Sequence, residues 1–179
     1  MFFSVCVFCG SKNGNSEKYI EAASKIGELL SKRDFKVIYG GGKNGVMGAL
    51  AKGVMHNKGE LISIIPKYFK NKNIVIKNSS QTIYTRNFSE RKNLMIESAD
   101  IFLVLPGGYG TLDELFEVIS LNQLKIINKK IVLLDIENFW SPLKMMIKDL
   151  KKNGFLYTSK NIFFKSSVNK AVEFIENNL

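Results

Sequence analysis

Short apolar runs alternate with longer amphipathic segments along most of this 179-residue chain. Strands are expected at residues 3–8, 35–39, 61–65, 81–84, 101–105, 131–134 and 162–164. Helices are expected at residues 16–32, 45–57, 89–98, 111–126 and 139–152, with a last one from residue 167. Apolar strands separated by helices are typical of a parallel sheet covered on both faces. The alternation predicts a single α/β domain over residues 1–179, with a doubly wound, mostly parallel, Rossmann-like sheet and helices on both faces.

Ligands of doubly wound sheets bind at the carboxyl ends of the strands, and two glycine-rich turns stand at such ends. The first, at residues 40–45, reads GGGKNG and matches the dinucleotide pattern G-x-G-x-x-G. It follows the second expected strand, and the acidic residue expected ~20 residues further on is missing from the end of the next strand. A glycine turn that leads into a helix still offers N–H groups to a phosphate. The turn indicates contact with a phosphate or ribose, the alternative being a tight turn without a ligand.

The second glycine turn, at residues 106–111, reads PGGYGT and also leads into a helix. It lacks the Gly-Lys-Ser/Thr of a P-loop, but its amides can bind an anion in the same way. Glu114 would then project a carboxylate from the same helix start. The alternative is a capping box, with Thr111 at the N-cap and Glu114 as the third helical residue. Spacing alone favours the capping box.

Arg91 and Lys92 stand together near the start of another expected helix, after Ser89. Cations at a helix N-terminus oppose the helix dipole, so local helix energetics does not account for them. An anionic ligand held among the turns does, because arginine grips phosphate in a bidentate manner. The alternative is a solvated helix face.

The remaining composition narrows the classes of protein. No apolar run approaches the ~20 residues needed to cross a bilayer, and the opening residues lack the basic leader of a signal peptide, so we expect a cytoplasmic protein without a membrane partner. The net charge of +10 is spread as single lysines, without an arginine-rich tract, which favours attraction for small anions over nucleic acid. One His and two Cys leave little for a metal site. Cys6 and Cys9, three apart on a strand, should point to opposite faces of the sheet.

Four stretches together resemble the LOG ("lonely guy") family: FCGS at 8–11, YGGGKNGVMG at 39–48, ERK at 90–92 and PGGYGTLDE at 106–114. Members of this family are cytokinin riboside 5′-monophosphate phosphoribohydrolases, which release the free base and ribose 5-phosphate. The resemblance implies the same hydrolysis here, on the 5′-monophosphate of an adenine or N6-substituted adenine nucleoside. It also implies a homodimer, with the helix at 112–124 as a candidate two-fold interface, and no metal or organic cofactor.

The resemblance assigns roles to particular residues. Arg91 and Glu114 correspond to the family's catalytic pair, and Lys92 to a substrate contact. The substrate-binding turns would include Gly10, Ser11, Gly41, Gly42, Gly45, Gly107, Gly108, Tyr109, Gly110, Thr111 and Asp113. The chemistry of the reaction agrees with a glutamate in the catalytic pair. Cleavage of a ribosyl C–N bond builds positive charge on the sugar, and a carboxylate can stabilise this charge while it activates water. Arg91 would serve the phosphate, the leaving base or both.

Two other classes of function stay open at this point. One is a non-catalytic nucleotide-binding or sensing protein that uses the same turns. The other is a decarboxylase dependent on pyridoxal phosphate, which needs a lysine that forms an aldimine with the cofactor. Many relatives of the family have carried the label "possible lysine decarboxylase", which the resemblance does not support.

Overall fold

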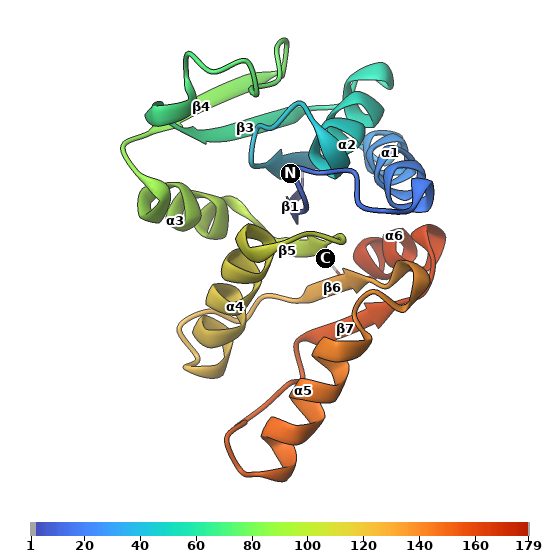
Figure 1. Cartoon of the computed structure of the whole chain (residues 1–179), viewed down its shortest axis with the longest axis vertical. Helices are drawn as coiled ribbons and strands as arrows, with labels where there is room; N and C mark the ends of the chain where they lie inside the picture. The colour runs from blue at the N-terminus through green and yellow to red at the C-terminus, as the bar shows by residue number, and fades with distance from the viewer. Residues whose placement is uncertain (1–2, 179) are drawn as a thin grey trace.

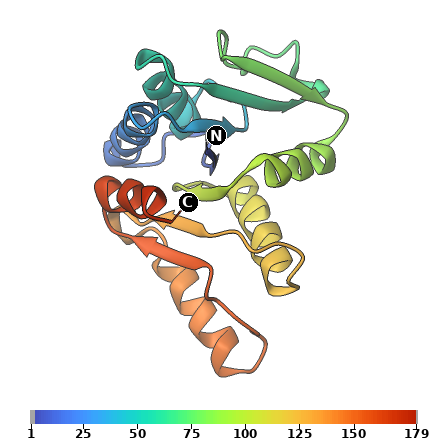
Figure 2. The ribbon, with the colours of Figure 1, turned by 180° about the vertical axis from the view of Figure 1, so that it is seen from behind.

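The computed structural model describes residues 3–178, and a sheet of seven parallel strands forms its centre (Figures 1 and 2). The strands are β1 (Ser4–Phe8), β2 (Lys36–Tyr39), β3 (Leu61–Pro66), β4 (Gln81–Thr85), β5 (Ile101–Val104), β6 (Ile131–Leu134) and β7 (Ile162–Lys165). The helices are α1 (Glu17–Ser31), α2 (Gly45–His56), α3 (Phe88–Ser98), α4 (Tyr109–Gln123), α5 (Ser141–Lys152) and α6 (Val168–Glu176). Two 3₁₀ turns, η1 (Lys67–Phe69) and η2 (Ile136–Asn138), follow β3 and β6. The predicted doubly wound α/β fold is confirmed, while residues 1–2 and 179 of the predicted domain lie outside the described residues.

The order in which the chain adds strands to the sheet reverses between the neighbouring strands β1 and β5. Its strand order is β4-β3-β2-β1-β5-β6-β7, so the chain runs outward from β1 to one edge and from β5 to the other. Phe8 at the end of β1 lies opposite Val104 at the end of β5. The turns that follow these strands touch, because the Gly10 N–H donates to the Pro106 carbonyl at 3.1 Å. This reversal is the point at which doubly wound sheets form their ligand crevice.

Two apolar cores lie on the two faces of the sheet. Helices α1, α2 and α6 cover one face, and α3, α4 and α5 cover the other (Figure 1). Cys6 belongs to the second core and Cys9 to the first, and both thiols are free and buried. The expectation that these two side chains point to opposite faces is confirmed.

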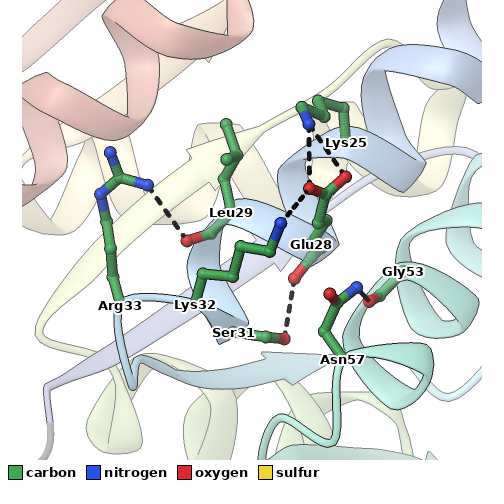
Figure 3. Close-up of polar contacts among 9 residues, drawn as sticks. Lys25, Glu28, Leu29, Ser31, Lys32, Arg33, Gly53 and Asn57 are labelled. Carbon is green, nitrogen blue, oxygen red and sulfur yellow. Dashed lines mark hydrogen bonds and ion pairs between the residues drawn. The ribbon is translucent and has the colours of Figure 1, made fainter.

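Helices α1 and α2 approach each other closely because glycines line their contact. A Cβ at Gly27 would come within 2.4 Å of an α2 carbonyl oxygen, and one at Gly53 within 2.2 Å of an α1 carbonyl oxygen. Figure 3 shows polar contacts around this helix pair. Glu28 forms ion pairs with Lys25 of α1 and with Lys32 at the C-cap of α1, and the Asn57 side chain donates to the Gly53 carbonyl. The contact fixes α2, and with it the glycine turn at residues 40–45 from which α2 starts.

Helices α3, α4 and α5 begin within two residues of their predicted starts, and the shift at α4 changes the interpretation of Glu114. Helix α3 begins at Phe88 and is capped by Asn87, whose side chain accepts the Glu90 N–H at 2.8 Å. Helix α4 begins at Tyr109, two residues before the predicted start, with Gly108 at the N-cap. Thr111 therefore lies inside the first turn of α4 and Glu114 in the second. Thr111 and Glu114 therefore do not form a capping box, and helix capping does not explain the glutamate at residue 114.

The lysine- and asparagine-rich segment at 67–80 lies beside the first glycine turn. After η1 it forms an isolated antiparallel bridge between Val75 and Gly42. The Lys43 N–H donates to the Ile74 carbonyl at 2.8 Å, and the Ile76 N–H donates to the Gly41 carbonyl at 2.9 Å. These bonds hold the segment across the carboxyl end of β2.

Candidate active site

A cavity of about 940 Å³ lies at the carboxyl ends of the central strands. Its walls are the turn after β1, the two glycine turns, parts of the segment at 65–75, and the side chains of Arg91 and Glu114. The volume is at the upper end of the roughly 300–1,000 Å³ typical of small-molecule sites. The cavity is therefore large enough for a nucleotide, and it occupies the switch point of the sheet.

Most residues assigned from the sequence line this cavity. They are Gly10, Ser11, Gly41, Gly42, Arg91, Gly107, Gly108, Tyr109, Gly110, Thr111 and Glu114. Gly45, Lys92 and Asp113 are not in the lining. Gly45 lies beneath the turn after β1, where it has a positive φ of 63° and a Cβ would come within 2.4 Å of the Ser11 carbonyl carbon. The backbone of this turn thus explains the glycine at residue 45 without a ligand.

The start of α4 has the features of an anion site. No side chain caps this helix, and within residues 3–178 the N–H groups of Tyr109, Gly110 and Thr111 donate to no backbone acceptor. A Cβ at Gly108 or Gly110 would meet nothing within 4 Å, so the space beside these amides is open. Free first-turn amides and the positive end of the helix dipole together attract a phosphate.

The start of α2 differs, and here the sequence interpretation is wrong in part. The Val46 N–H donates to the Lys12 carbonyl at 3.3 Å, and the Met47 N–H donates to the Gly10 carbonyl at 3.0 Å. The turn after β1 thus occupies amides that the glycine pattern indicated as free. Of the two helix starts at the cavity, that of α4 leaves more of its first-turn amides free.

Arg91 and Glu114 form a buried ion pair at the cavity wall. Arg91 comes from the first turns of α3 and Glu114 from the second turn of α4, and they expose only 7% and 5% of their surface. Arg91 Nη1 donates to Glu114 Oε1 at 2.6 Å, and Arg91 Nε donates to the Ile64 carbonyl at 3.0 Å. The solvated-face alternative for Arg91 is therefore wrong, because a carboxylate and a carbonyl of the protein hold its guanidinium.

Burial raises the pKa of the Glu114 carboxyl, and the adjacent Arg91 guanidinium opposes that rise. Oε1 is engaged by Arg91, while no other donor among the described residues bonds Glu114. The second carboxylate oxygen is thus available to a water or a sugar in the cavity. A carboxylate with a raised pKa and a free oxygen in a pocket is suited to general-base chemistry.

Lys92 lies outside the cavity lining and connects the same two helices. Its Nζ lies 3.0 Å from Asp113 Oδ2 and 2.7 Å from Glu117 Oε2 of α4. The two carboxylates raise the pKa of the Lys92 ammonium, with Glu117 as the larger cause. Carboxylates of α4 therefore pair with both adjacent cations of α3, so a bound anion is not required to explain them.

Sequence reasoning missed the apolar wall of the cavity. It consists of Tyr19, Met47, Phe69, Ile74, Phe88 and Phe139, among other side chains. Phe69 and Phe88 meet edge to face at 5.8 Å between ring centroids, and so do Tyr19 and Phe139 at 5.9 Å. Phe69 and Phe139 follow the carboxyl ends of β3 and β6, so the strand-end rule that singled out the glycine turns points to them as well.

Two kinds of feature are absent from the described residues. Between residues 3 and 178, no three His, Cys, Asp or Glu side chains are grouped so that they could hold a metal ion. No helix in this range has both the length and the apolar character needed to span a bilayer.

The chain is similar to known families and proteins. The model of a family described as "Possible lysine decarboxylase" matches residues 47–177. The cytokinin riboside 5′-monophosphate phosphoribohydrolase LOG5 of Arabidopsis thaliana is 38% identical over 168 residues, which are 94% of this chain and 74% of that protein. LOG1 of the same plant, which has the same descriptive name, is 37% identical over 155 residues, covering 87% of this chain and 73% of that protein.

Solved structures of similar fold have more distant sequences. The molybdenum cofactor carrier protein of Chlamydomonas reinhardtii superposes with a TM-score of 0.77 at 18% identity, over 99% of this chain and 98% of that one. At this identity the match bears on the fold alone.

Proposed function

This chain belongs to the family of the LOG proteins, whose family model is described as "Possible lysine decarboxylase". On this basis we propose that it is a nucleoside 5′-monophosphate phosphoribohydrolase. It hydrolyses the N-glycosidic bond of an adenine or N6-substituted adenine nucleotide and releases the base and ribose 5-phosphate. The observation that carries the proposal is the buried Arg91–Glu114 pair in a cavity that the uncapped start of α4 also lines.

The 5′-phosphate binds to the free amides at the start of α4, which fixes the ribose in the cavity. Glu114 faces the anomeric carbon, stabilises the oxocarbenium-like charge and takes a proton from the attacking water. Arg91 holds one Glu114 oxygen at 2.6 Å and keeps the carboxylate in place. The water's oxygen bonds to C1′ and the C–N bond breaks. The leaving base takes up the proton that Glu114 removed from the water, which returns Glu114 to its ionised form.

The base packs against the apolar wall. Aromatic side chains offer flat or edge contacts to a planar purine, and Phe69 and Phe88 are arranged edge to face at that wall. We therefore place the base near these rings and the phosphate near α4, which orients the glycosidic bond towards Glu114.

The assembly and location follow as further parts of the proposal. The chain forms a homodimer through α4, because Phe116 of this helix and Leu124 at its C-cap expose 36% and 65% of their surface although both are apolar. Light scattering after gel filtration tests this state. The free thiols of Cys6 and Cys9 fit a reducing cytoplasm.

The proposed activity is tested by incubating the purified protein with a panel of nucleoside monophosphates and separating the products by chromatography. Release of adenine and ribose 5-phosphate from AMP is expected. Binding of AMP without release of a base would instead favour a nucleotide sensor.

A further inference from the structure

The three consecutive glycines at the end of β2 have different neighbours. Gly41 has a φ of +76°, which disfavours any side chain. A Cβ at Gly42 would meet the flexible end of Met47, with the sulfur at 2.8 Å. A Cβ at Gly40, whose backbone is outside the left-handed region, would lie 2.1 Å from Nη2 of Arg91.

The guanidinium of Arg91 cannot move away from residue 40 without losing its partners. Nη1 donates to Glu114 and Nε donates to the Ile64 carbonyl. The group is buried, so water does not replace a lost bond easily. Apart from Arg91, the nearest obstacle to a Gly40 Cβ is the terminal methyl of Met47 at 3.4 Å, an ordinary contact.

We infer that Gly40 is a positioning residue for Arg91: the missing side chain at residue 40 leaves the space that lets one guanidinium bridge the Ile64 carbonyl and the Glu114 carboxylate. Gly40 acts on the reaction through Arg91, not through contact with a phosphate. The kinetic consequence rests on the proposed hydrolysis, whereas the coupling between the two residues does not. This role accounts for a glycine at residue 40, although the neighbouring α2 amides of Val46 and Met47 are already bonded.

A double-mutant cycle tests the inference with two readouts. Gly40→Ala in the otherwise unchanged protein should lower the melting temperature by on the order of 5 °C and reduce kcat roughly tenfold or more. Arg91→Lys keeps a positive charge for Glu114 but lacks the Nη2 arm. In the Arg91→Lys background, Gly40→Ala should therefore cost little further in either readout.

Gly42→Ala is the matched control, because it adds the same methyl to the same turn but meets Met47 in place of Arg91. Its effect, whatever its size, should be the same in both backgrounds. Equal effects of Gly40→Ala in both backgrounds would contradict the inference. A rise in KM alone that persists beside Arg91→Lys would also contradict it and would assign Gly40 to ligand contact.

The melting measurement decides the inference even if the protein has no hydrolase activity, so failure of the proposed function is distinguishable from failure of the coupling. If Gly40→Ala alone does not fold, the Gly40→Ala/Arg91→Lys protein should fold, because the clash is gone. Failure of both to fold, while Arg91→Lys folds, would overturn the inference.

Discussion

Nη1 of Arg91 lies 2.6 Å from Oε1 of Glu114, and this buried contact joins α3 to α4 at the wall of the cavity. The two residues are 23 positions apart, and each comes from a helix on the same face of the sheet. Their pairing gives the proposed catalytic carboxylate a fixed position and a compensating charge.

Removal of Arg91 should be costly because it leaves a buried carboxylate without a partner. Arg91→Met is expected to lower the free energy of unfolding by about 3–5 kcal/mol. The double variant Arg91→Met/Glu114→Gln carries no unpaired charge and should be more stable than Arg91→Met alone. Urea denaturation measures both, and a double variant no more stable than the single one would contradict a charge pair at this site.

The pH dependence of kcat/KM should reflect the raised pKa of Glu114. Because the ionised carboxylate is the active form, activity should rise with pH through a limb that lies above the ordinary glutamate pKa of about 4.3. Arg91→Lys, which places its charge less favourably, should move the limb further up. The same raised pKa favours the protonated carboxyl in the folded state, so the contribution of Glu114 to stability should fall as pH rises through this range.

The substrate phosphate titrates at roughly pH 6 and needs a control. Binding of ribose 5-phosphate to Glu114→Gln reports the phosphate titration alone. A limb of kcat/KM that coincides with this binding curve and does not move in Arg91→Lys would assign the limb to the phosphate and not to Glu114.

The amide of Tyr109 is expected to bind the phosphate directly. Tyr109 is the first residue of α4 and follows the extended Gly108, so proline fits there without breaking the helix. Tyr109→Pro removes the N–H and should raise the KM for AMP roughly tenfold, whereas Tyr109→Ala keeps the N–H and should bind AMP much more tightly than the proline variant. Equal KM values for the two variants would exclude this amide.

The same phosphate contact predicts substrate selectivity. AMP should be cleaved and adenosine, which lacks the anion, should not, while ribose 5-phosphate should inhibit as a product. Equal rates on AMP and adenosine in a product assay would rule out the proposed binding mode.

Lys92 should act on stability more than on substrate binding. It lies outside the cavity lining and pairs with Asp113 and Glu117. Lys92→Ala is expected to lower stability by about 1 kcal/mol or less and to leave the KM for AMP within a few-fold of the original. A large rise in KM at unchanged stability would restore the substrate contact that the family resemblance implies.

The sequence predicted the strands and the two glycine turns because apolar runs and glycine clusters are local signals. It misplaced the start of α4 because Gly108 caps through its backbone, whereas the Thr111–Glu114 spacing imitates a capping box. It could not reveal the role of Gly40, since the space it leaves is filled by Arg91 from another helix. The occupied amides of Val46 and Met47 were equally hidden, because their acceptors lie in the turn after β1.

The turnover of Glu114→Gln with AMP tests the central claim most directly, with Glu117→Gln as the control. Glu117 lies one turn further along α4, outside the cavity lining, and pairs with Lys92. The account predicts a folded Glu114→Gln protein that binds ribose 5-phosphate but turns over AMP at least ~10²-fold more slowly, while Glu117→Gln stays within a few-fold of the original. Undiminished turnover by a folded Glu114→Gln protein would contradict the account.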